Sequence, residues 1–249
     1  MLAVLVAGLL GQEVSWAEEV HPAAVKEIRQ GDAPSLVGEG LQPLQAGRML
    51  NKEGGRHVTV TEVRGNAQVR VGENWQPLRA GMVLREGAVV QTGRGSSVVF
   101  FLDENGDSGQ LELKEKAQLS LKTLQSDPTS GDQTTELDLA IGCVLVHAAK
   151  LKGRSKFEVN DPVATAGVRG TGFLTCVAID PLVGLASTTN VYEGLVVVRE
   201  HRKRSEMEVP EGRGGSVVRV GRMREGKIPE RERARGLDRI KEMIRLRGD

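Results

Sequence analysis

The glycine-rich stretch DPVATAGVRGTGFLT, residues 161–175, has the composition of a loop that could bind a phosphate or border a catalytic centre. Its glycines follow the order G-x-x-G-x-G, whereas the dinucleotide-binding motif has the order G-x-G-x-x-G and opens a helix. The residues after Gly172 favour a strand, so no helix N-terminus is expected to receive a phosphate. We therefore expect a sharp strand-to-strand crossing, in which Gly170 and Gly172 allow positive φ or close backbone approach.

The side chains of this crossing follow from the same interpretation. Val168 and Phe173 are expected in the core at the two ends of the crossing. Arg169 and Thr171 are expected to hydrogen-bond neighbouring backbone groups. A ligand-contacting role for Arg169 remains the alternative.

A second stretch, DENGDSGQLELK, resembles the start of a calcium-binding loop through Asp103, Asn105 and Asp107. Ser108 then stands where such a loop requires glycine, and Lys114 stands where it requires a bidentate glutamate. A turn between two strands explains the same Asp, Asn and Gly residues equally well. The pattern therefore favours a turn over a metal site.

Nothing else in the sequence forms a pattern of catalytic or metal-binding residues. The four histidines show no ligand spacing; they are His21, His57, His147 and His201. His147 lies in an apolar strand-like run and is expected to be a hydrogen-bonded strand residue. Because no nucleophile, base and acid stand in a recognisable arrangement, we expect no catalytic residues, no metal and no cofactor, and hence no enzyme.

The remaining pattern predicts an all-β chain. Short apolar runs alternate with turn residues, and the 31 glycines suit many tight turns. The run LDLAIGCVLVHA is long enough for Gly142 to mark a bulge or bend. Only residues 229–249 look helical, with Pro229 in the first turn and an apolar stripe of Leu237, Ile240 and Ile244.

One supersecondary unit is partly duplicated. VGEGLQPLQAGRML begins at Val37 and VGENWQPLRAGMVL begins at Val71. The alignment predicts that residues 25–57 echo the first β-unit, with Leu41 equivalent to Trp75 and both facing apolar neighbours. Two copies are too few for a solenoid that stands alone.

The N-terminus and the two cysteines bear on location. The apolar run Leu2–Leu10 and the small residues before Glu18 favour a signal peptide over residues 1–17, cleaved after Ala17, with an uncleaved anchor as the alternative. No later segment is expected to span a membrane. Export would place Cys143 and Cys176 in an oxidising compartment, where they are either buried thiols or a disulfide. The net charge of +1 argues against wholesale binding to nucleic acid or an anionic surface.

In order and spacing the chain resembles the FecR domain, over about residues 62–199. The most specific pieces are VVQTGRGSS, VRGTGF and VYEGLVVV. The resemblance implies an extracytoplasmic all-β module with a twisted solenoid-like or sandwich-like fold. It also implies a set of motif residues that we interpret as structural: Thr92, Gly93, Arg169, Gly170, Thr171 and Gly194.

These observations divide the chain and suggest a role. After the signal peptide and the partial duplicate we expect a FecR-like β-domain over residues 58–200, a hairpin tip and last strand over 201–228, and the helix.

The best-known family members link an outer-membrane receptor to an anti-sigma segment. The expected function is a non-catalytic, periplasmic or secreted module that binds a protein or envelope polymer. A sensor acting with an anti-sigma factor or outer-membrane receptor is the alternative. The expected contact regions are the basic tip EHRKRSE, residues 200–206, and the helix around Leu237–Ile244.

Overall fold

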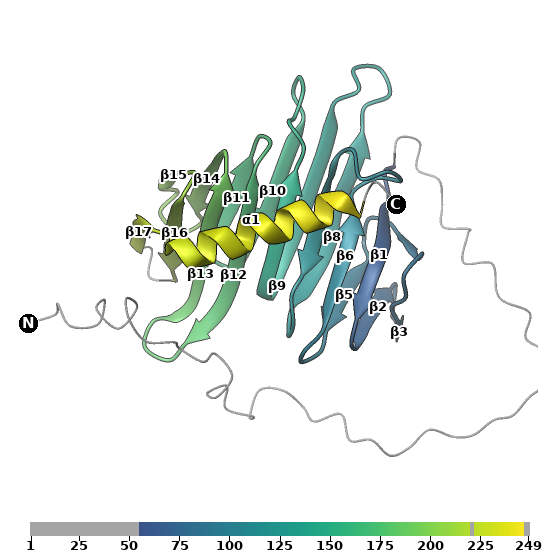
Figure 1. Cartoon of the computed structure of the whole chain (residues 1–249), viewed down its shortest axis with the longest axis horizontal. Coiled ribbons are helices and arrows are strands. Elements are labelled where there is room, and N and C mark those ends of the chain that lie inside the picture. Colours follow the sequence, from purple (N-terminus) through teal and green to yellow (C-terminus); the bar gives the residue numbers. More distant parts are fainter. Residues whose placement is uncertain (1–54, 220–221, 247–249) are drawn as a thin grey trace, which may run out of the picture. The chain divides into compact units, whose positions relative to one another are not determined.

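The computed structural model describes residues 55–219 and 222–246, which belong to one compact unit (Figure 1). The expected signal peptide and nearly all of the expected duplicate, including Leu41, lie outside the described residues. The described chain is almost entirely strands, followed by one C-terminal helix. The prediction of an all-β fold with a short terminal helix is therefore confirmed.

The elements follow one another along the chain with short connections. The strands are β1 (Val58–Arg64), β2 (Ala67–Val71), β3 (Asn74–Pro77), β4 (Val83–Leu84), β5 (Val89–Thr92), β6 (Ser97–Phe101), β7 (Gly109–Leu113), β8 (Gln118–Ser126), β9 (Gln133–Ala148), β10 (Lys156–Asn160), β11 (Ala164–Val168), β12 (Gly172–Asp180), β13 (Gly184–Glu193), β14 (Leu195–Glu200), β15 (Glu206–Pro210), β16 (Arg213–Val218) and β17 (Arg222–Lys227). The helix α1 spans Glu230–Arg245.

Hydrogen bonding arranges these strands into two sheets that share β9. The first sheet has the order β3-β2-β5-β8-β9-β10-β11-β14-β15. The second sheet has the order β4-β1-β6-β7-β9-β12-β13-β16-β17. All neighbours are antiparallel except β9 and β10, which are parallel. Each sheet is thus open, with an edge strand at both sides, and the first sheet is mixed because it contains the parallel pair β9–β10.

The strand β9 turns from the first sheet into the second at Gly142. Residues 133–141 pair with β8 in the first sheet, and residues 142–147 pair with β12 in the second. Gly142 has φ +86°, and a Cβ there would lie 2.6 Å from the Cα of Ala117. Because only glycine tolerates both conditions, the bend predicted from its position is confirmed.

One hydrophobic core lies between the two sheets, built mainly from Val, Leu and Ala. Val69 and Leu119 of the first sheet and Val144 and Phe173 of the second belong to the same buried cluster. Val168 is buried as well, as predicted for both ends of the crossing. With few aromatic residues, the core depends on close packing of branched aliphatic side chains.

The strand register defines two ends of the sandwich. At the Gly142 end, hairpin turns join β10 to β11, β12 to β13, β14 to β15 and β16 to β17. At the opposite end, here the Gly170 end, the chain instead passes between the sheets, from β11 to β12, from β13 to β14 and from β15 to β16. Strands β10 to β17 therefore have hairpins at one end and crossings at the other.

Three features differ from the sequence prediction. Only one further strand was expected after residue 200, whereas the structure has β15, β16 and β17 there. Trp75 was expected to face apolar neighbours. It is 41% exposed on β3, with the guanidinium of Arg70 5.6 Å from its ring centroid. The reason is that β3 is an edge strand whose residues are all exposed.

Candidate interaction surface

The motif glycines at the Gly170 end allow two crossings to stack. Gly170 has φ +78°, and a Cβ on it would lie 2.8 Å from the Cα of Lys150. Gly194, at the next crossing, has φ +80°, and a Cβ there would lie 3.0 Å from the carbonyl oxygen of Gly170. The backbone N–H of Ala148 donates to the carbonyl of Thr171. No side chain fits between these backbones, so the glycines serve the packing of crossings.

The two polar side chains of this crossing behave differently from the prediction. Arg169 is exposed. Thr171 is buried, but its hydroxyl has no hydrogen-bond partner among the described residues. The expected hydrogen bonds of these two side chains to backbone groups are therefore not found among the described residues.

Thr92 and Gly93 hold a second set of crossings, at the Gly142 end. The hydroxyl of Thr92 donates to the carbonyl of Lys114, 2.5 Å away, and accepts the N–H of Ala117 at 3.0 Å. The N–H of Gly93 donates to the carbonyl of Asn66 at 2.8 Å. The residues of the family motif thus fall into two separate stacks rather than into one site.

The two other candidate positions also serve local structure. The carboxylate of Asp103 accepts the N–H groups of Asn105, Asp107 and Ser108, as a turn requires. His147 is half-buried on β9, and its Nδ1 has no partner within the described chain, which corrects the expected hydrogen bond. Burial lowers the pKa of His147 below its ordinary value, although the charge of Glu193 opposes the shift. No group of three or more His, Cys, Asp or Glu residues in the described ranges could hold a metal ion.

The two cysteines form a disulfide in the structure, the second of the two arrangements that the sequence left open. Cys143 on β9 and Cys176 on β12 are direct cross-strand partners with Cα atoms 4.1 Å apart. Both are half-buried, one residue from core positions, on the outer face of the second sheet. The bond ties together the two strands that carry most of this face.

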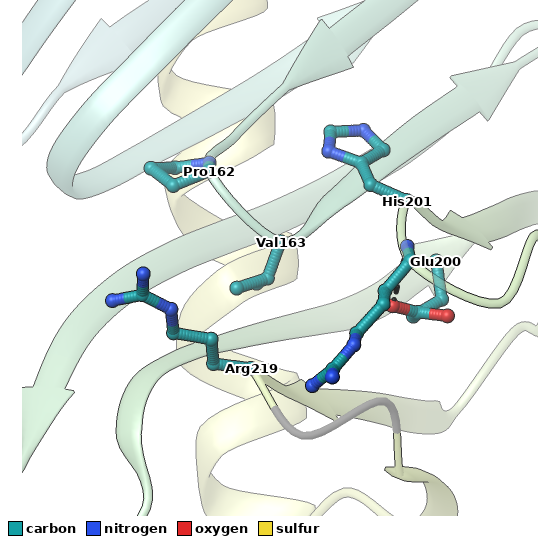
Figure 2. Close-up of a pocket in the computed structure, with 6 residues that line it drawn as sticks. Pro162, Val163, Glu200, His201 and Arg219 are labelled. Carbon is teal, nitrogen blue, oxygen red and sulfur yellow. Dashed lines mark hydrogen bonds between the residues drawn. The ribbon is translucent and has the colours of Figure 1, made fainter.

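A hollow of about 490 Å³ opens at the Gly142 end between three hairpin turns. Pro162 and Val163 come from the β10–β11 turn, and Glu200, His201 and Arg202 come from the end of β14 and the β14–β15 turn. Arg219 comes from the β16–β17 turn. Figure 2 shows Pro162, Val163, Glu200, His201 and Arg219 around this space. A shallower hollow adjoins it along Arg199, Glu200, His201, Arg204 and Glu206.

The hollow contains two arginines and one glutamate, and the glutamate carboxylate is hydrogen-bonded within its own turn. The carboxylate of Glu200 is buried and accepts the N–H of Arg202 at 2.7 Å and the N–H of Lys203 at 2.5 Å. Arg202 and Arg219 form no ion pair within residues 55–219 and 222–246. The Nε2 of His201 lies 2.9 Å from the hydroxyl of Thr165. The surface therefore presents two arginine side chains without an ion-pair partner in the described chain, beside one carboxylate that is hydrogen-bonded to its own turn.

Asp161 orders the β10–β11 turn, which contributes Pro162 and Val163 to the hollow. Its Oδ1 accepts the N–H groups of Val163 and Ala164, each at 2.7 Å, and its Oδ2 accepts the hydroxyl of Ser187 at 2.5 Å. Burial raises the pKa of Asp161 above its ordinary value, and these hydrogen bonds, with the nearby His201, oppose the shift. Asp161 thereby fixes the β10–β11 turn against β13.

The helix α1 runs across the outer face of the second sheet (Figure 1). Ile240 and Met243 are fully buried against Leu145 and Tyr192. Gly236 permits this approach, because a Cβ there would lie 2.4 Å from the Tyr192 ring. Most of the apolar stripe is therefore used in the fold, and the expected helix surface around Leu237–Ile244 offers little for a partner.

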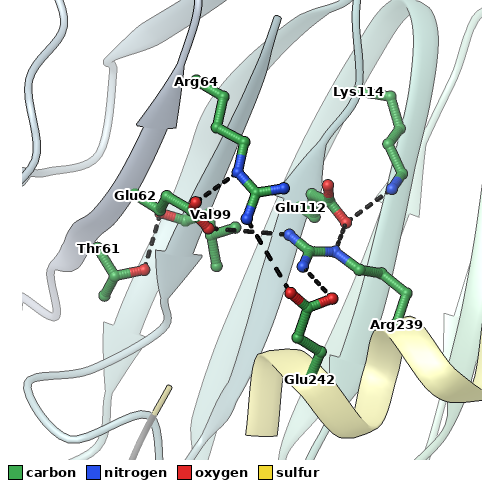
Figure 3. Close-up of polar contacts among 8 residues, drawn as sticks. All are labelled: Thr61, Glu62, Arg64, Val99, Glu112, Lys114, Arg239 and Glu242. Atoms are coloured by element: carbon green, nitrogen blue, oxygen red, sulfur yellow. Dashed lines mark hydrogen bonds and ion pairs between the residues drawn. The ribbon is translucent and has the colours of Figure 1, made fainter. Parts of the chain in front are cut away.

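An ion-pair network clamps the second half of the helix to the sheet (Figure 3). The Nε of Arg239 lies 2.8 Å from Glu112, and its Nη1 lies 2.6 Å from Glu242. Lys114 lies 2.7 Å from the same Glu112 oxygen. Burial alone would raise the pKa of Glu112, but the hydrogen bonds from Arg239 and Lys114 outweigh it and hold that pKa below its ordinary value.

Sequence reasoning found the basic turn but missed the rest of the hollow. Pro162, Val163 and Arg219 lie far from residues 200–206 in the chain, and no local pattern links them.

In the described ranges, no helix is both long and apolar enough to cross a membrane.

Comparisons with known proteins give one family and, among solved structures, distant matches that include the following two. Two crystal structures of a "putative anti-sigma factor" from Parabacteroides distasonis ATCC 8503, at 2.50 and 1.65 Å resolution, are similar at 17% identity and a TM-score of 0.46. The alignments cover 60% of this chain and 63% and 64% of the other chains, so this chain spans less than two thirds of their length. No curated protein matches.

The family comparison covers half of the chain. The model described as FecR protein matches residues 88–213, from the strand before the Thr92–Gly93 crossing to the start of β16. It includes both stacks of motif crossings and the basic β14–β15 turn. The sequence motifs, the two-sheet fold and this match agree, and the chain belongs to the FecR family.

Proposed function

We propose that the protein is a non-catalytic, exported FecR-type module that binds an acidic segment of a regulatory partner protein in the basic hollow. The observation that carries the proposal is the charge of this hollow. Arg202 and Arg219 face it without a carboxylate partner in the described chain, and Glu200 is turned into its own loop. Cations left unpaired beside a hollow attract an acidic peptide and orient it.

The construction of the hollow supports a binding role rather than a catalytic one. Its walls come from three hairpin turns on a rigid sandwich, which is where proteins commonly present binding residues. Among the described residues that line the deeper hollow, Glu200 is the one carboxylate, and both of its oxygens accept backbone N–H groups. A general acid or base needs a free oxygen within reach of a substrate, which Glu200 does not offer.

A sensor that acts with an anti-sigma factor or an outer-membrane receptor is the more specific form of this proposal. Family membership supports it, since the best-known members relay a signal by protein contact. The same hollow would then receive the partner. An anionic envelope polymer is the competing occupant.

The test is co-purification from envelope extracts with a matched charge control. The double variant Arg202→Glu/Arg219→Glu should lose at least about tenfold of partner capture, and capture by the wild type should weaken with salt. The control Arg79→Glu/Arg94→Glu makes the same change in net charge at exposed positions outside the hollow and should capture normally. Equal capture by both double variants would refute the hollow as the binding site.

Two other outcomes are informative. Capture that survives protease treatment of the extract but not removal of its polysaccharide would assign the hollow to a polymer. Turnover of an envelope polymer by the purified protein, abolished by replacing a single acidic residue, would refute the non-catalytic role.

A further inference from the structure

The β12–β13 hairpin ends in an apolar tip that no other described residue covers. Leu182 is 75% exposed, Ile179 69% and Val183 37%. Asp180 is the charged residue of the tip, and its Oδ1 accepts the N–H groups of Leu182 and Val183, at 2.8 and 3.0 Å. Asp180 therefore shapes the turn, while the aliphatic side chains project from it.

This tip extends beyond the strands on both sides. On one side, the pairing of β12 with β9 ends at Val177, which is paired with Gly142. On the other, the pairing of β13 with β16 begins only at Ala186, which is paired with Val218. Residues 178–184 thus form a hairpin that extends beyond both neighbouring strands at the Gly142 end (Figure 1). A protruding tip can enter another phase without moving the sandwich.

Arginine residues stand beside the base of the tip. The N–H of Arg219 donates to the carbonyl of Leu185, 2.9 Å away, which places the β16–β17 turn directly against the hairpin. Arg222 opens β17 opposite Val218. Both side chains are exposed, and neither forms an ion pair within the described ranges. We call Arg219 and Arg222 the arginine collar.

The size and chemistry of this surface favour one occupant. Three aliphatic side chains expose well under the roughly 800 Å² per partner that a stable protein interface buries. Shallow burial of a few aliphatic side chains beside cationic groups is, in contrast, sufficient for reversible binding to anionic lipid headgroups. We propose that the tip, residues 179–183, inserts into an anionic lipid surface while the arginine collar contacts the headgroups.

Binding to anionic lipid through this tip does not require the whole chain to carry a large positive charge. The net charge of +1 argues against binding along a broad surface. Binding through one tip requires only that positive charge gather beside the apolar residues. The proposal does not require the hollow to bind a partner, although Arg219 lines the hollow and also belongs to the arginine collar.

The first test places a reporter on the tip. The described cysteines are both in the disulfide, so Leu182→Cys can be labelled selectively with a polarity-sensitive nitrobenzoxadiazole dye. Vesicles of phosphatidylcholine with phosphatidylglycerol should raise its emission by about threefold or more and make it quenchable by spin-labelled acyl chains. Pure phosphatidylcholine should give a much weaker response. The control Thr129→Cys, at the β8–β9 turn at the Gly170 end, should not respond.

The second test removes the tip chemistry from the full chain. The variant Ile179→Asn/Leu182→Asn should reduce insertion, read from the dye placed at Val183→Cys, by about tenfold or more. Because both side chains are largely exposed, the variant should fold like the wild type. Arg219→Gln/Arg222→Gln should weaken binding by several-fold and remove most of its salt dependence.

Three outcomes would overturn the proposal. They are no dye response to anionic vesicles, an equal response from Thr129→Cys, or a response to solubilised envelope proteins but not to lipid, which would assign the tip to a protein. Partner capture by the hollow is measured without vesicles. A wild-type protein that captures its partner but gives no dye response to anionic vesicles would therefore refute this inference alone.

Discussion

At the Gly170 end of strands β10 to β17 the chain passes between the two sheets, whereas at the Gly142 end the same strands are joined by hairpins. The first end is closed: Gly170 and Gly194 are pressed against backbone atoms of neighbouring crossings. The second end is open and carries the basic hollow and the apolar tip. At one end of these strands packing restricts which residue types fit, and at the other end many side chains are compatible with the fold.

The difference explains why a strong sequence motif does not mark the candidate site. The motif residues Arg169–Thr171 and Gly194 lie at the closed end, where glycine is needed because another residue would not fit. The residues that can meet a partner lie on turns at the open end, where many side chains are compatible with the fold. In this chain, the motif residues serve the packing of crossings, and the proposed binding surface lies on hairpin turns outside the motif.

A matched pair of glycine substitutions tests this comparison and should give the largest effect. Gly170→Ala should destabilise by about 3 kcal/mol, because it combines left-handed strain with a clash against the Lys150 backbone. Gly184→Ala, at φ +74° with nothing within 4 Å of its Cβ, should cost only about 1 kcal/mol from strain alone. Urea unfolding of the two variants measures the difference. Equal costs would show that the crossing can relax and that the Gly170 end is not closed as described.

The helix clamp should give the next largest effect. Ile240 of α1 packs against Gly172 at the Gly170 end, so the helix helps to close it. Arg239→Met leaves the buried Glu112 with Lys114 alone and should destabilise by about 2 kcal/mol. Arg245→Met, an exposed arginine in the last turn, should change stability by less than about 0.5 kcal/mol.

The pH dependence sharpens this prediction. The pKa of Glu112 is lowered in the folded state, so its contribution is present above the ordinary value of 4.5 and is lost as the pH falls through the folded pKa. Arg239→Met should reduce this acid sensitivity between pH 5 and about 3. An unchanged slope in denaturant titrations would show that Lys114 alone maintains the shift.

Much of the fold was predictable because it depends on local signals. Alternating apolar residues identified most strands, and the length of the run around Gly142 indicated the bend. The two edge strands β15 and β17 were missed because each has one partner strand and few buried residues, such as Val209 in β15. Their sequences therefore lack the apolar alternation that identifies a strand.

The candidate surface was only half predictable, for a different reason. The basic turn around His201 stands out in the sequence, but its partners in the hollow come from turns more than a dozen residues away. Gly236 has a low intrinsic helix propensity, but the close approach of the Tyr192 ring requires a glycine there. Contacts between distant segments leave no periodic trace, so the sequence could not reveal either one.

The last prediction concerns Asp161 and should give the smallest effect. Burial raises its pKa above the ordinary value of 3.8, against the opposing hydrogen bonds and His201. An acid whose pKa is raised on folding adds stability at low pH and loses that contribution as the pH rises through the folded pKa. At neutral pH, the buried carboxylate therefore costs stability, although its hydrogen bonds order the β10–β11 turn.

Asp161→Asn keeps an oxygen for the N–H groups of Val163 and Ala164 and offers an amide to the hydroxyl of Ser187. The variant should be as stable as the wild type at pH 7 or more stable by up to about 1 kcal/mol. The wild type should gain stability relative to the variant as the pH falls toward 4, which denaturant titrations across that range would measure. A large loss of stability in the variant at neutral pH would mean that the charge itself holds the turn. The Gly142 end would then depend on a fixed ion, and its hairpins would be less free to vary than the crossings are.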